Sequence, residues 1–160
     1  GRMQTAIDAE GGTVIEFLGD AILAVFGAPE AQEDHPARAV RCAQAMRTLL
    51  DELNAEADAS GLSDLWKRAG VEHLAHRVGI HSGPAVAGNI GSATRMKYAV
   101  LGDTVNIAAR LEQLNKEKGT DVLVSGATRD RLHADLQEQL DEVGTLPVKG
   151  RVEPVQVYRL

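Results

Sequence analysis

At 160 residues, with 44% hydrophobic and 25% charged residues, the chain has the size and composition of one water-soluble domain with a single core. Its net charge of −6 argues against a nucleic-acid partner or an anionic membrane surface, because both bind basic patches. The sequence has no apolar run near the roughly 20 residues of a membrane span and no secretory signal, and its single cysteine cannot form an internal disulfide, so we expect a cytoplasmic domain.

The first predicted elements are the end of a helix and a β-hairpin. Residues 3–10 have the pattern of a helix end, which Gly11-Gly12 would terminate. Two apolar runs follow at 14–18 and 21–26, separated only by Gly19-Asp20. Two strand-like runs joined by a Gly-Asp step predict a tight hairpin with Asp20 at its turn. Because the chain starts inside a helical pattern, we expect the domain to begin upstream of residue 1.

A long helix is predicted next. Asp34-His35-Pro36 is typical of a helix start, with Asp34 near the N-cap and Pro36 in the first turn. Apolar residues then recur at helical spacing to about Glu56, and Cys42 lies in this stripe, where we expect it to be buried. A short helix is expected from Leu62 to Arg68, and the surrounding stretch 58–76 suggests no function.

Short strands and helices alternate over the rest of the chain. We expect strands at 77–81, 84–88 (as a continuation or a new strand), 96–101, 121–125 and, at a sheet edge, 152–160. Helices are expected after Gly102-Asp103, with Asp103 as the N-cap, and at 128–136. With one N-terminal strand missing, this order predicts an α+β fold, a ferredoxin-like sandwich with helices on one face of an antiparallel sheet.

Three motifs and a closing segment stand in order along the chain. They are residues 11–27 with Glu16-Phe17-Leu18-Gly19-Asp20, then Arg77-Val78-Gly79-Ile80-His81-Ser82-Gly83 with Gly88-Asn89-Ile90-Gly91, then Tyr98–Leu111 with Gly102-Asp103-Thr104-Val105-Asn106, and finally Val148-Lys149-Gly150 with Val155-x-Val157-Tyr158. This ordered set resembles the catalytic domain of class III adenylate and guanylate cyclases over nearly the whole chain. We therefore interpret residues 1–160 as one such domain, incomplete at its N-terminus.

The resemblance implies an enzyme that converts a nucleoside triphosphate to the cyclic 3′,5′-monophosphate and pyrophosphate, in cyclic-nucleotide signalling. Two divalent ions, Mg²⁺ or Mn²⁺, are the usual device for such a displacement. Asp20 resembles one of the two aspartates that hold them, and the other is expected upstream of residue 1. From spacing alone, Asp20 would be read as an ordinary turn residue, and the surrounding match reverses that interpretation.

Asn106 and Arg110 stand four residues apart, so they share one face of the predicted helix. By resemblance, Asn106 orients the ribose and Arg110 stabilises the charge that develops on the α-phosphate, for which a guanidinium fork is suited. Lys149 resembles the lysine that holds the terminal phosphates. Without the resemblance, these would be residues of a solvated helix face and a surface loop.

Two positions in the family set the choice of base, and Glu16 and Ala99 occupy them here. A glutamate at the first position goes with GTP, because a carboxylate accepts hydrogen bonds from guanine N1–H and its amino group. Adenine N1 is itself an acceptor, and such a mismatch costs roughly 1–3 kcal/mol. Ala99 departs from both family patterns and offers no side-chain hydrogen bond. We expect GTP to be favoured and ATP to be possible.

The family builds each active site from two subunits, so the resemblance implies a homodimer with shared sites, and a sensor or regulatory domain in the parent chain. Membrane attachment of the full protein is left open. Two other functions remain: a catalytically degenerate nucleotide-binding or dimerisation module of the same family, and an interaction domain with no site. The first is disfavoured because Asp20, Asn106, Arg110 and Lys149 are all present.

Overall fold

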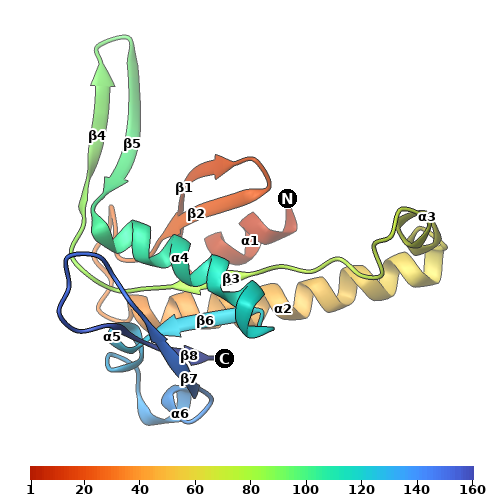
Figure 1. The fold of residues 1–160 in the computed structure, drawn as a ribbon. Coiled ribbons are helices and arrows are strands. Elements are labelled where there is room, and N and C mark those ends of the chain that lie inside the picture. The colour runs from red at the N-terminus through yellow and green to blue at the C-terminus, as the bar shows by residue number, and fades with distance from the viewer.

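At the centre of the fold lies a sheet of four strands in the order β3-β6-β8-β7 (Figure 1). These strands are β3 (Val78–Ile80), β6 (Val122–Ser125), β8 (Val155–Arg159) and β7 (Asp141–Leu146). Strand β3 runs parallel to β6, whereas the β6–β8 and β8–β7 pairs are antiparallel. The computed structural model describes all residues from 1 to 160.

Helices α2 (His35–Ser60) and α4 (Asp103–Lys118) cover opposite faces of this sheet. Alternation along the fully buried strand β6 produces this arrangement, because successive side chains of a strand point to opposite faces. Val122 and Val124 belong to the apolar cluster with α2, while Leu123, between them, belongs to the cluster with α4. Both helices are therefore held against the same central strand.

The N-terminal segment forms a separate layer on α2. Helix α1 (Arg2–Ala9) precedes an antiparallel hairpin of β1 (Thr13–Leu18) and β2 (Ala21–Val25). Ile7 of α1 and Cys42 of α2 are buried in one cluster with the inner side chains of the hairpin. The hairpin at Gly19-Asp20 and the burial of Cys42 are thus confirmed.

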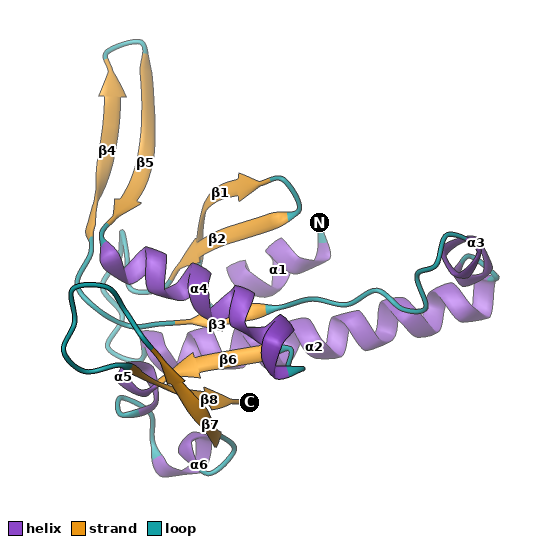
Figure 2. Ribbon diagram, in the orientation of Figure 1, coloured by secondary structure: helices purple, strands orange, loops and turns teal.

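Two parts of the chain project from this body (Figure 2). One is a second antiparallel hairpin, of β4 (Val86–Ser92) and β5 (Arg95–Leu101), which confirms the option of a new strand after β3. The other is the end of α2 together with α3 (Ser63–Arg68). Helix α2 continues four residues beyond the expected Glu56, to a left-handed glycine at position 61 with φ of 74°.

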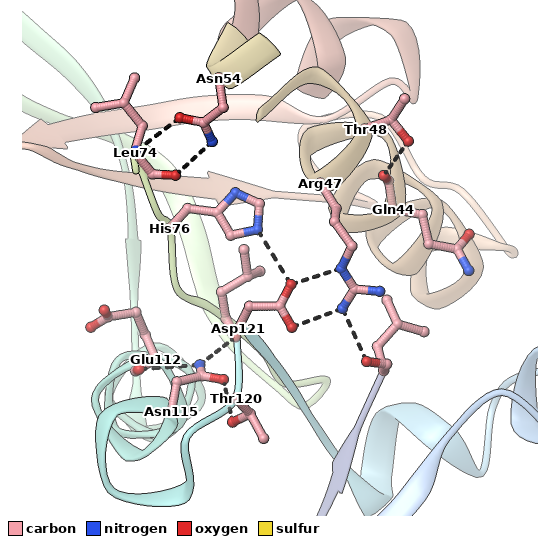
Figure 3. Close-up of polar contacts among 12 residues, drawn as sticks. Gln44, Arg47, Thr48, Asn54, Leu74, His76, Glu112, Asn115, Thr120 and Asp121 are labelled. Atoms are coloured by element: carbon pink, nitrogen blue, oxygen red, sulfur yellow. Dashed lines mark hydrogen bonds and ion pairs between the residues drawn. The ribbon is translucent and has the colours of Figure 1, made fainter. Parts of the chain in front are cut away.

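Polar contacts fasten the projecting end of α2 to the body (Figure 3). The Asn54 side chain donates to the backbone oxygen of Leu74 and accepts from its amide, each at 2.9 Å. Closer to the sheet, the Arg47 guanidinium donates to both carboxylate oxygens of Asp121, at 2.7 and 2.9 Å. The chain between α3 and β3 is therefore held against α2 at Leu74.

The C-terminal third differs from the expectation in three elements. The prediction of a single helix at 128–136 is wrong. Helices α5 (Gly126–Arg129) and α6 (Ala134–Gln137) are separate, because His133 between them is extended. Strand β7 was not anticipated, and it takes the edge position. Strand β8, expected at an edge, consequently pairs on both sides.

The α+β class with antiparallel pairing is confirmed. Two details differ from the expected sandwich, since helices cover both faces of the sheet and one strand pair is parallel. Strand β3 pairs only with β6, and the missing N-terminal strand stays a prediction. None of the helices combines the length and the apolarity needed to cross a membrane.

Candidate active site

Asp20 lies at the turn of the β1–β2 hairpin, directly after Gly19, whose φ of 65° a glycine adopts without strain. Its side chain is exposed and makes no hydrogen bond or ion pair with another residue of the chain. Both carboxylate oxygens are therefore free to accept a ligand. Hard oxygen donors of this kind suit Mg²⁺ or Mn²⁺, so the residue fits the predicted metal-binding role, although no group of three or more potential ligands surrounds it.

Helix α4 presents Asn106 and Arg110 on one exposed face. Ile107 and Leu111, one position further along, are fully buried against the sheet and fix the rotation of the helix. Neither Asn106 nor Arg110 has a side-chain partner within the chain. An amide and a guanidinium one turn apart can bind a sugar hydroxyl and a phosphate group of the same ligand.

The start of α4 differs from the expectation. Gly102, with φ of 137°, is the N-cap residue, and no side chain caps the helix. Asp103 is instead the first helical residue, and its carboxylate lies 3.7 Å from the guanidinium of Arg151. A glycine at this position is required because few other residues adopt such a φ.

The contact between Asp103 and Arg151 brings the loop between β7 and β8 to the start of α4. Lys149 is in this loop and is exposed, while its neighbour Val148 is buried in the α4 cluster and anchors the loop. Lys149 and Arg110 are both cations without an acidic partner. Two such charges near one helix suit a polyanionic ligand such as a triphosphate.

Glu16, on β1, forms an ion pair with Lys97 of β5. Lys97 and Ala99 are two residues apart on β5, so their side chains lie on the same face of the strand. The structure therefore joins the two positions assigned to base choice through Lys97. Sequence analysis missed Lys97, although the period of two along a strand placed it beside Ala99.

Asp20 is not brought together with the other site residues within one chain. Asp20 contacts none of the other predicted residues, and Figure 1 shows the β1–β2 turn at the far end of its hairpin from the start of α4. Two open hollows, of about 710 and 510 Å³, flank His76 and Asp121 and contain none of the six predicted site residues. A single chain thus presents the predicted groups as separate sets, with Asp20, Asn106, Arg110 and Lys149 exposed and Glu16 and Ala99 half-buried.

The whole chain, residues 1–160, matches the family described as the adenylate and guanylate cyclase catalytic domain. Adenylate cyclase 1 of Rhizobium meliloti is 38% identical over 154 residues, which are 96% of this chain and 22% of that protein. The adenylate cyclase of Anabaena cylindrica is 30% identical over 99% of this chain and 30% of its own length. The chain thus spans less than a third of these two relatives.

Solved structures of both kinds of cyclase are similar to this fold. The guanylyl cyclase Cya2 superposes with a TM-score of 0.79 at 35% identity, covering 99% of this chain and 74% of that one. The adenylyl cyclase CyaB from P. aeruginosa has a TM-score of 0.71 at 29% identity, covering 99% of this chain and 76% of the other.

Proposed function

Because this chain belongs to the adenylate and guanylate cyclase catalytic domain family, we propose that it converts a purine nucleoside triphosphate to the cyclic 3′,5′-monophosphate and pyrophosphate. The observation that carries the proposal is the pair of free side chains on α4, Asn106 and Arg110, with the free cation Lys149 on the neighbouring loop. These are groups for a ribose and a triphosphate, on rigid supports.

In the proposed reaction, the ribose 3′-oxygen attacks the α-phosphorus, its proton leaves to solvent, and the bond to the pyrophosphate oxygen breaks. Asn106 orients the ribose, and Arg110 stabilises the added charge on the α-phosphate oxygens. Lys149 binds the terminal phosphates and so favours departure of pyrophosphate. Asp20 would hold divalent cations, which supply charge neutralisation and a lower pKa of the attacking hydroxyl.

We further propose that two copies of the chain build each site. Asp20 lies on a different element from Asn106, Arg110 and Lys149, and no contact links it to them. Exposed apolar side chains lie on both hairpins, where water would otherwise contact them: Phe17 (60% exposed), Leu18 (54%), Val86 (72%) and Met96 (60%). A second copy covering these surfaces would bury them and bring its own Asp20 to the free face of α4.

For the base, the proposal is a preference for GTP. The Glu16 carboxylate forms an ion pair with the Lys97 ammonium, and its remaining lone pairs can accept from guanine N1–H and the amino group. Ala99 adds no polar contact, so discrimination rests on one side chain. The two relatives are each more than three times as long as this chain. A regulatory domain would lie in the corresponding further part of the protein.

The test is turnover of GTP and ATP with Mn²⁺ by the intact protein and by Asp20→Ala. Because the Asp20 side chain is exposed and unpartnered, the variant should keep its melting temperature and lose metal-dependent product formation by at least about a hundredfold. Asp130→Ala is the matched control, since Asp130 is a turn aspartate 77% exposed at its side chain. Full activity in Asp20→Ala would refute the proposed role.

A further inference from the structure

The first turn of α4 is tied to the chain that enters β4. The Thr104 hydroxyl donates to the backbone oxygen of Pro84 at 2.6 Å. Gly83 lies directly beneath this bond, because a Cβ at position 83 would lie 2.7 Å from Thr104 Oγ1 and 3.4 Å from its Cγ2. The backbone of Gly83 shows no left-handed φ, so its conformation does not require a glycine. The lack of a side chain at position 83 instead leaves room for Thr104.

The body of α4 is fixed independently. A Cβ at Gly79 would lie 2.3 Å from the backbone oxygen of Ala108 and 2.3 Å from the amide nitrogen of Glu112, so the helix packs on bare strand backbone. Further along, the Asn115 side chain donates to the Val78 oxygen at 2.9 Å. These contacts hold the helix from its second turn onward. In the first turn, the Thr104 hydroxyl bond stands beside the more exposed contact of Asp103 with Arg151.

The segment that receives the Thr104 hydroxyl is itself anchored in the core. The Ser82 hydroxyl lies 2.8 Å from that of the fully buried Thr128, and Nδ1 of His81 lies 2.7 Å from the hydroxyl of the fully buried Ser125. Ser125 ends β6 and caps α5. Residues 81–84 are therefore a fixed support, held by two side chains of the central sheet and its following helix.

We infer that Thr104 is a positioning residue for the proposed reaction. We also infer that position 83 is a glycine because a larger residue there would displace the Thr104 side chain. By fixing the first turn of α4 on the support at 81–84, the hydroxyl sets where Asn106 and Arg110, two and six residues later, meet the ribose and the α-phosphate. This inference rests on the proposed function. A shift of about 1 Å in such groups can lower a rate by up to a hundredfold.

A double-mutant cycle tests the inference, with kcat and KM measured on the intact protein. Thr104→Ala removes the hydrogen bond from the Thr104 hydroxyl to the Pro84 oxygen. Gly83→Ala displaces the Thr104 side chain, so that the same bond is lost. Each variant should lower kcat about tenfold and leave KM within about twofold, because the displaced groups act on the transition state. The double variant should lose no more than either one, since Thr104→Ala also removes the atoms that a Cβ at position 83 would strike.

Three controls separate positioning from general stability. Thr104→Ser keeps the hydroxyl and should restore kcat. Thr48→Ala removes a hydroxyl bond of 3.3 Å to Gln44 on the exposed surface of α2, far from the site, and should leave kcat unchanged. Amide exchange at residues 103–106 should rise in Thr104→Ala and Gly83→Ala without a change in melting temperature.

Several results would overturn the inference. An unchanged kcat in Thr104→Ala, multiplicative losses in the double variant, or no recovery in Thr104→Ser would each do so while leaving the proposed function intact. If the unmodified protein formed no cyclic nucleotide, the proposed function would fail and this inference with it, so the two failures are distinguishable.

Discussion

The carboxylate of Glu16 and the ammonium of Lys97 form an ion pair that joins β1 to β5. Glu16 is one of the two positions assigned to base choice, and Lys97 is on the same strand face as the other, Ala99. Lys97 holds the Glu16 carboxylate in one orientation. In the proposed site, the pair would set which hydrogen-bond acceptors a purine meets.

Exchange of the two charges tests this relationship. In the double variant Glu16→Lys with Lys97→Glu the ion pair is retained, but an ammonium donor replaces the carboxylate acceptor at position 16. We expect kcat/KM of the unmodified protein to favour GTP over ATP by a factor on the order of ten to a hundred, and the exchange to favour ATP. Addition of Ala99→Asp should increase the shift. A tenfold preference of the unmodified protein for ATP would show that Glu16 does not contact the base.

Complementation tests the shared site. Asp20→Ala and Asn106→Ala should each be inactive alone. A mixture that forms mixed dimers should regain up to about a quarter of the activity, because half of the dimers are mixed and each has one intact site of two. The measurement is cyclic nucleotide formed per total protein, with mixing confirmed by exchange of labelled chains. Mixed dimers without activity would contradict a site built from two copies.

The ion pair of Arg47 with Asp121 links α2 to the start of β6 and should contribute to stability (Figure 3). Burial by itself would raise the pKa of Asp121, but the hydrogen bonds and charge of Arg47 outweigh burial and lower it. We expect Asp121→Asn to lower the free energy of unfolding by about 1 kcal/mol, a value reduced for partial exposure. Asp141→Asn, at the more exposed pair with Arg159, is the control and should change it by only a few tenths of a kcal/mol.

Three half-buried histidines predict a loss of stability in mild acid. Burial, the largest cause for each, lowers the pKa of His35, His76 and His81 below the ordinary 6.5. A lowered pKa in the folded state means that stability is complete above pH 6.5 and declines as the pH falls below 6.5 through the folded values. Urea unfolding at pH 7.5 and 5.5 should show this decline, and His76→Gln should reduce it. Equal stability at both pH values would contradict the prediction.

Local chemistry explains which elements could be predicted. The β1–β2 hairpin follows from two apolar runs around Gly19-Asp20, and α4 follows from apolar spacing after Gly102. Strand β7 was missed because two acidic residues open it and Gly144, with φ of 135°, breaks its alternation at a bulge. Strand β7 forms by pairing with β8, and the local sequence of β7 does not indicate that partner.

The candidate site divides in the same way. Asp20, Asn106, Arg110 and Lys149 belong to recognisable motifs, and the structure places all four on exposed positions. The ion pair of Glu16 with Lys97 and the support beneath Thr104 join segments distant in sequence. Such contacts depend on how hairpins and helices pack, which composition and spacing do not determine.

The most direct test of the central claim is product analysis. The intact protein with Mn²⁺ and a nucleoside triphosphate labelled at the α-phosphate should form the cyclic 3′,5′-monophosphate and pyrophosphate in equal amounts, and Arg110→Ala should slow this by at least about a hundredfold. Formation of a nucleoside diphosphate with inorganic phosphate, or no metal-dependent product from either GTP or ATP, would contradict the account.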